Sequence, residues 1–225
     1  MPDRLPVGVL ISGRGSNMEA LIRAAADPAY PARIALVLSN RADAPGLATA
    51  RAHGIAVEAM PHQGHSREAH EALMTARLQQ AGVHLVALAG YMRVLTPAFI
   101  AEWPDRLLNI HPSLLPAFPG LDTHARALAA GCKLHGCTVH FVRAEVDAGP
   151  IIAQAAVPVL DDDTPETLAA RVLREEHRLI PQAVTWFAEG RLRVDGMRVR
   201  VIDQSSRSSP PATSVTPKHR PQRAR

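Results

Sequence analysis

The feature that most constrains the fold of this chain is a regular alternation of short apolar runs with segments of helical periodicity. The apolar runs occupy residues 5–12, 33–39, 55–59, 83–89 and 106–111, and helical patterns follow the first four at 18–26, 44–53, 66–81 and 97–102. Nearly continuous apolar runs of this length are typical of strands buried on both faces of a parallel sheet. The alternation indicates βαβ units, so we expect an α/β protein with an open, mostly parallel, twisted sheet and helices on both faces, a Rossmann-like fold.

The later part of the chain has a different pattern, which predicts antiparallel strands. Residues 134–143 and 150–159 are expected strands, and the short turn around Asp147 that joins them favours a hairpin over a crossover. A long amphipathic helix is expected over 164–188, with Asp163 or Thr164 as its N-cap and a proline in its first turn. Two short strands within 191–202 then close the predicted domain.

The charge distribution separates this domain from a basic tail. The 225 residues include 25 Lys and Arg against 21 Asp and Glu, a net charge of +4. Five of the basic residues and none of the acidic ones lie beyond Gln204, which leaves 20 against 21 in residues 1–204. We therefore expect one domain over 1–203, without the basic field of a nucleic-acid-binding protein, and a disordered Pro- and Ser-rich tail over 204–225.

Composition also bears on the compartment. No stretch of 18 uncharged apolar residues occurs, so we expect no transmembrane helix and no membrane partner. The N-terminus leads into the first strand without the apolar region of a signal peptide. With two cysteines, Cys132 and Cys137, no disulfide framework is possible, and the cytoplasm is the expected location.

Candidate binding residues follow the first predicted strand. The loop G-R-G-S-N covers residues 13–17 and joins that strand to a helix. Gly15 allows a close backbone approach, while Ser16 and Asn17 offer polar side chains at the helix N-terminus, where a phosphate monoester could bind. The spacing matches neither the dinucleotide fingerprint nor the Walker A loop, so a simple tight turn with an N-cap is the alternative.

Candidate catalytic residues follow a later strand. Asn109 and His111 lie two positions apart and therefore point to the same face of the sheet, where an amide and an imidazole could stabilise an oxyanion. The alternative is a polar strand end satisfied by the backbone. Asp147 is either an ordinary turn cap or, if it faces His111, the partner that favours a protonated imidazole and completes an acid–base pair.

We expect no metal site. His62, His65 and His70 lie near one another in the sequence, but no cysteine or carboxylate cluster with ligand spacing accompanies them, and a solvated loop explains them better. A G-x-S-x-G motif is also absent, which argues against a serine hydrolase.

At this point several segments, in order along residues 6–202, closely resemble the family of folate-dependent phosphoribosylglycinamide formyltransferases. The matching segments are L-I-S-G-R-G-S-N (10–17), S-N-R-A-D-A-P-G-L (39–47), S-R-E (66–68), L-A-G-Y-M-R-V-L (88–95), L-L-N-I-H-P-S-L-L-P (107–116), H-G-C-T-V-H-F-V (135–142), D-A-G-P (147–150) and Q-A-A-V-P-V (154–159). The resemblance implies transfer of the formyl group of 10-formyltetrahydrofolate, a co-substrate, to the amine of glycinamide ribonucleotide in purine biosynthesis. Both implied partners are small molecules, and no metal is required.

The resemblance also implies a role for each site residue. It makes Asn109, His111 and Asp147 the catalytic residues around the formyl group. Ribonucleotide binding falls to Gly15, Ser16, Asn17 and, in the long C-terminal helix, Glu176. Folate binding falls to Arg67, Met92, Arg93, Val94, Leu95, Asn109 and Asp147, with Arg67 meeting the glutamate tail. The Leu115–Pro116 bond is expected to be cis.

Two positions depart from the family pattern. Arg14 stands where the family more often has Asn, and we expect its side chain to point to solvent. Ala148 stands where the family commonly has Gly, so the turn beside Asp147 tolerates it only if φ at that position is negative.

Related enzymes with the same fold are the nearest alternatives. A formyltetrahydrofolate hydrolase usually carries a regulatory domain before the first strand, and a methionyl-tRNA formyltransferase carries a C-terminal RNA-binding domain. We expect neither, because the first strand begins near residue 5 and only a short tail follows residue 203. A non-catalytic nucleotide-binding module is the alternative from a different class.

Overall fold

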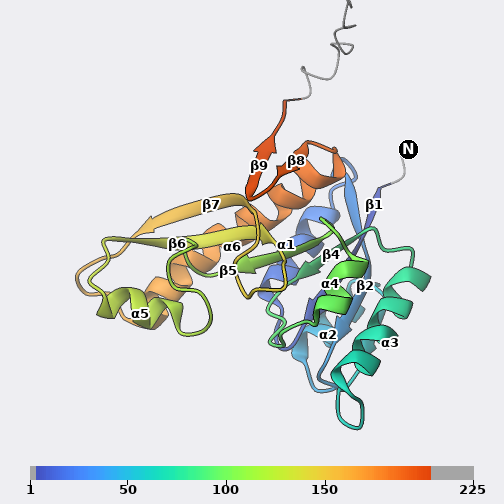
Figure 1. The fold of residues 1–225 in the computed structure, drawn as a ribbon. Helices are drawn as coiled ribbons and strands as arrows, with labels where there is room; N and C mark the ends of the chain where they lie inside the picture. Colours follow the sequence, from blue (N-terminus) through green and yellow to red (C-terminus); the bar gives the residue numbers. More distant parts are fainter. Residues whose placement is uncertain (1–3, 204–225) are drawn as a thin grey trace, which may run out of the picture.

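The computed structural model describes residues 4–203, which form one continuous sheet with helices on both sides (Figure 1). The predicted tail at 204–225 lies outside the described residues. In chain order the elements are β1 (Leu5–Ile11), α1 (Ser16–Ala25), β2 (Ala32–Ser39), α2 (Pro45–Ala52), β3 (Val57–Ala59), α3 (Arg67–Gln80), β4 (Leu85–Leu88), α4 (Pro97–Glu102), β5 (Leu107–His111), α5 (Thr123–Ala129), β6 (Leu134–Phe141), β7 (Ile151–Pro158), α6 (Pro165–Ala188), β8 (Leu192–Asp195) and β9 (Arg198–Val201).

The sheet confirms the predicted fold class. Its strand order is β3-β2-β1-β4-β5-β6-β7-β9-β8, and the first five strands are parallel. β6 pairs antiparallel with both β5 and β7, and β8 pairs antiparallel with β9, which forms the antiparallel C-terminal part. Strand order reverses between β1 and β4, and in open α/β sheets a ligand binds at the carboxyl ends of the strands beside such a reversal.

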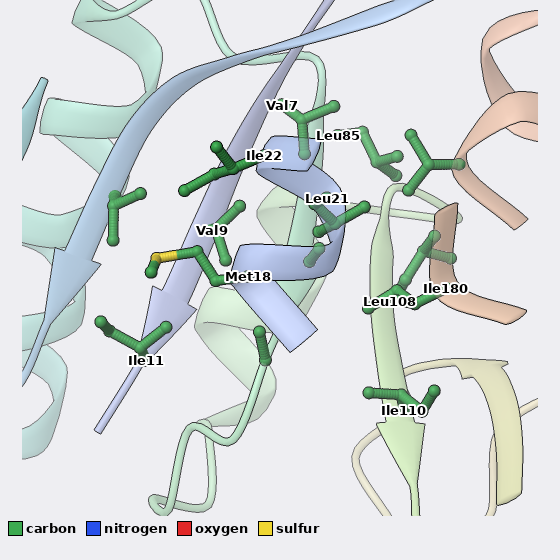
Figure 2. Close-up of a cluster of buried hydrophobic side chains, with 14 of the residues drawn as sticks. Val7, Val9, Ile11, Met18, Leu21, Ile22, Leu85, Leu108, Ile110 and Ile180 are labelled. Atoms are coloured by element: carbon green, nitrogen blue, oxygen red, sulfur yellow. The ribbon is translucent and has the colours of Figure 1, made fainter. Parts of the chain in front are cut away.

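The alternation of side chains along each strand divides the core between the two faces of the sheet. Val7, Val9 and Ile11 of β1 belong to one buried cluster with side chains of α1, α2 and α6. Figure 2 shows the β1 side chains around those of α1, and Ile180 of α6 beside Leu108 of β5. Leu10 points to the other face, where α3 and α4 cover it. Because both faces of β1 are buried, its sequence is apolar throughout, and the strand that precedes the G-R-G-S-N loop is held rigidly.

Local signals in the sequence set several helix ends. Ser66 accepts a hydrogen bond from the backbone N–H of Ala69 and begins α3, and Thr164 forms a capping box with Thr167 at the start of α6. The expected N-cap at Thr164 is confirmed. Helix α5 was not predicted, because its seven residues carry no extended apolar period. Among residues 4–203 every helix is too short or too polar to cross a bilayer.

Candidate active site

A cleft of about 660 Å³ opens at the carboxyl ends of the central strands. It is lined by Asn17 after β1, by residues 90–95 after β4, and by Asn109 and His111 at the end of β5. Residues 120–124, the turn after β6 and Glu176 of α6 also line it. The cleft therefore lies beside the reversal of strand order, where this topology places ligands.

His111 and Asp147 meet in this cleft. Nδ1 of His111 lies 3.3 Å from Oδ2 of Asp147, and both side chains are buried. Nε2 of His111 lies 3.0 Å from the backbone carbonyl oxygen of Phe118. Both ring nitrogens thus face hydrogen-bond acceptors, an arrangement that suits the doubly protonated imidazolium. The same carboxylate oxygen of Asp147 accepts the backbone N–H of Gly120 at 2.8 Å, which fixes its orientation.

The turn that carries Asp147 depends on a close backbone contact. Asp147 has φ 54° and occupies the left-handed region, which aspartate tolerates better than most residues. A Cβ added at Gly149 would lie 1.7 Å from the carbonyl oxygen of Phe141, so only glycine fits there. Ala148 is absent from the positive-φ positions, so the turn accepts alanine at this departure from the family pattern.

Asn109 is oriented by a histidine that the sequence analysis did not assign. Asn109 and His140 are direct partners in the β5–β6 ladder, and the Nδ2 of Asn109 lies 3.3 Å from the Nε2 of His140. Nδ1 of His140 lies 2.9 Å from the carbonyl oxygen of Phe141. Burial lowers the pKa of His140, although the Phe141 carbonyl and Asp147 oppose this. The neutral ring then carries its proton on Nδ1 and accepts the Asn109 amide at Nε2.

Only the antiparallel register of β5 and β6 reveals this role of His140. The signal lay in its motif, H-G-C-T-V-H-F-V, once the two strands are aligned with Asn109 opposite His140. The other histidine of that motif, His135, is buried against Phe118 and His124. It does not line the cleft.

The cleft lining holds a second polar pair, Asn17 and Glu176. The Nδ2 of Asn17 donates a 2.6 Å hydrogen bond to Oε2 of Glu176, and both residues are buried. Burial raises the pKa of Glu176, and the bond from Asn17 partly offsets that effect. Oδ1 of Asn17 is buried without a hydrogen-bond partner, and Gly15 precedes the helix in a left-handed conformation with φ 72°. This part of the cleft can accept a polar ligand.

Apolar side chains surround the mouth of the cleft. Met92, Val94, Leu121 and Val146 line it and are exposed over half or more of their surface. Exposed apolar groups gathered around a concave site indicate a ligand with a flat apolar part. Arg93 and Leu95 also line the cleft.

Three of the candidate residues lie outside this lining. Gly15 and Ser16 form the turn from which Asn17 enters the cleft, and Arg67 is an exposed residue at the start of α3. Their assigned roles stay predictions. The side chain of Arg14 is exposed, as expected.

The loop after His111 is tightly bound to the sheet. Its Leu115–Pro116 peptide bond is cis, which confirms that prediction. The Oγ1 of Thr138 donates to the carbonyl oxygen of Ser113 at 2.7 Å and accepts the N–H of Leu115 at 3.0 Å. Because this loop also presents the Phe118 carbonyl, the hydrogen bonds of Thr138 help to position His111.

The part of the chain that the structure describes contains no cluster of side chains with the composition of a metal site. No group of three or more His, Cys, Asp or Glu side chains there could hold an ion. His62 and His70 stack edge to face, and the Nε2 of His70 lies 2.7 Å from the carbonyl oxygen of Met60.

Comparison with known proteins agrees with this geometry. The family model described as formyl transferase matches residues 6–184. Over 187 residues the chain is 46% identical to the phosphoribosylglycinamide formyltransferase of Escherichia coli (strain K12). The aligned residues cover 83% of this chain and 88% of that protein. The chain belongs to the phosphoribosylglycinamide formyltransferase family. The family resemblance expected from the sequence is thereby confirmed.

Solved structures of this family and of a related enzyme share the fold. Glycinamide ribonucleotide transformylase 1 from Symbiobacterium toebii matches with a TM-score of 0.88 at 51% identity, covering 90% of this chain and 96% of that one. Formyltetrahydrofolate deformylase from Burkholderia mallei matches with a TM-score of 0.82 at 31% identity, covering 89% of this chain and 71% of that one. The transformylase is the more similar of these two structures.

Proposed function

We propose that this chain catalyses transfer of the formyl group of 10-formyltetrahydrofolate to the amine of glycinamide ribonucleotide. The observation that carries the proposal is the contact between His111 and Asp147, beside Asn109, in a cleft with an apolar mouth and a second polar pair. Family membership supplies the identity of the two substrates. We place the reaction in the cytoplasm, which agrees with the two free thiols.

Two parts of the cleft suit one substrate each. The flat pterin ring of the formyl donor fits the apolar mouth formed by Met92 and Val94. The ribonucleotide fits the part where Glu176 and the free Oδ1 of Asn17 can accept hydrogen bonds from its hydroxyl or amino groups. The formyl carbon and the amine would then meet beside His111.

The chemistry requires stabilisation of a developing oxyanion. As the neutral amine forms a bond to the formyl carbon, negative charge develops on the formyl oxygen. One N–H of Asn109 is oriented by His140, so the second N–H is available to that oxygen. A His111 ring that carries both protons would add a positive charge beside it. A well-placed donor of this kind typically contributes about 3–4 kcal/mol to the transition state.

Collapse of the tetrahedral intermediate completes the transfer. The bond between the formyl carbon and N10 of the folate breaks while the new amide bond remains. One proton leaves the attacking nitrogen and one reaches N10, so the reaction needs a group that relays a proton. Asp147 lies in the cleft beside His111 and can carry that proton through a bound water.

A two-substrate assay tests the proposal. Purified protein is mixed with 10-formyltetrahydrofolate and glycinamide ribonucleotide, and release of deformylated folate is followed by absorbance. We expect release only when the ribonucleotide is present. Equal release without the ribonucleotide would show hydrolysis instead, and no release under either condition would contradict the proposal.

A further inference from the structure

Glu71 is a buried carboxylate outside the catalytic group, and its side chain is bound by a single residue. Glu71 of α3 is only 4% exposed, although glutamate is rarely buried without a charged or strongly polar partner. All the hydrogen bonds that the described residues give the side chain of Glu71 come from Thr96. The N–H of Thr96 lies 3.2 Å from Oε1 and 3.1 Å from Oε2, and its hydroxyl donates a short bond to Oε2.

Thr96 connects this carboxylate to the cleft. Its hydroxyl oxygen also accepts the N–H of Phe99 at 3.2 Å and caps α4, and α3 packs against α4. Immediately before Thr96 comes the segment Met92–Leu95, all of which lines the cleft. The carboxylate therefore fixes the C-terminal end of a cleft-lining segment without itself reaching the cleft.

The other end of the same segment is fixed by a second polar contact. The Oγ of Ser12, at the end of β1, accepts the N–H of Met92 at 2.8 Å and donates to Oδ1 of Asn40 at 2.6 Å. Between the two anchors Met92 and Val94 are largely exposed. Leu95, at the end next to Thr96, is buried in the core, so the exposed stretch before it depends on contacts at its two ends for its conformation.

We propose that Glu71 is a positioning residue for the formyl donor, which holds the 92–95 segment through Thr96 in the conformation that binds the folate. Hydrogen bonds to a charged acceptor are stronger than neutral ones, so one buried carboxylate with several bonds to one residue is a firm anchor. The inference rests on the proposed function, since that assigns the apolar mouth of the cleft to the folate.

The test compares variants of both partners in the full-length protein. Glu71→Gln and Thr96→Val are each expected to raise the KM for 10-formyltetrahydrofolate, and the Kd for tetrahydrofolate measured by calorimetry, about tenfold. The KM for the ribonucleotide and kcat are expected to stay within about threefold of the wild type. Thr96→Ser, which keeps the hydroxyl, is expected to restore the wild-type KM for the donor.

A matched control separates positioning from general destabilisation. Leu78→Val weakens the packing of α3 at a fully buried position outside the cleft, and it is expected to lower Tm while leaving both folate constants unchanged. Folate constants within twofold of the wild type in Glu71→Gln and Thr96→Val would overturn the inference, as would equal shifts for both substrates. An inactive wild type would count against the proposed function instead, and the tetrahydrofolate titration would still decide the role of Glu71.

Discussion

Replacement of Asp147 by asparagine tests the proposed catalytic pair of His111 and Asp147 with little change of shape. The amide oxygen of asparagine can still accept the N–H of Gly120, which the carboxylate accepts at 2.8 Å, so the turn keeps its orientation. What is removed is the negative charge 3.3 Å from Nδ1 of His111. We therefore expect Asp147→Asn to fold normally and to lose activity.

The size of the loss follows from the distance. Two opposite unit charges at 3.3 Å interact with about 5 kcal/mol at an effective dielectric constant of about 20, which is an upper limit for the contribution of the pair. At about 1.36 kcal/mol per tenfold change in rate, that limit is about 5 × 10³-fold. Loss of a general acid–base group typically costs about 10²–10⁴-fold. We predict that Asp147→Asn and His111→Ala each lower turnover by about 10²–10⁴-fold.

A double variant shows whether the two residues act as one unit. Since each needs the other, His111→Ala combined with Asp147→Asn is expected to be within about fivefold of the slower single variant. Turnover is measured by folate release in the presence of both substrates, with circular dichroism to confirm folding. Asp122→Asn removes another carboxylate that lines the cleft and serves as the control, with activity expected within a few-fold of the wild type. Activity near the wild-type level in both single variants, or strictly additive losses, would refute the reasoning.

Three further perturbations test the structure around the site. Burial raises the pKa of Glu176, so its carboxyl binds a proton more tightly in the folded state. The free energy of unfolding therefore falls as pH rises from the ordinary glutamate pKa through the raised value. Glu176→Gln should remove this pH dependence in denaturant titrations and weaken ribonucleotide binding at least about tenfold. Gly149→Ala places a Cβ against the carbonyl oxygen of Phe141 and should lower the free energy of unfolding in urea by about 3 kcal/mol or more. Turnover should also fall, because the turn that carries Asp147 must move. An unchanged urea midpoint would contradict the close contact. Leu108→Ala should cost about 2–5 kcal/mol in the same unfolding assay at a fully buried position, while folded protein keeps its KM values; a cost below 1 kcal/mol would contradict the core packing.

The sequence predicts the sheet well because its strands are specified locally. Residues 5–11 are apolar on both faces, and the loop that follows them contains Gly15, whose φ of 72° suits the left-handed turn before α1. Helix α5 was not foreseen for the opposite reason. It is short, and it begins after Asp122, whose φ of 56° is unusual for a residue at that position.

The candidate site could be predicted only in part, because several of its contacts depend on register and packing. Asn109 and His111 were found from their spacing on one strand. The role of His140 required the antiparallel alignment of β6 against β5, and that of Glu71 required the packing of α3 beside α4. Neither contact leaves a local pattern in the sequence, since the partners lie 31 and 25 positions apart.

The proposed formyl transfer can be followed at the formyl carbon itself. Wild-type protein is incubated with glycinamide ribonucleotide and 10-formyltetrahydrofolate labelled with ¹³C in the formyl group, and the products are observed by NMR. We expect the label to appear in the formamide of the ribonucleotide, in equal amount to the tetrahydrofolate released. Label that accumulates as free formate, or that stays on the folate, would contradict the proposed transfer.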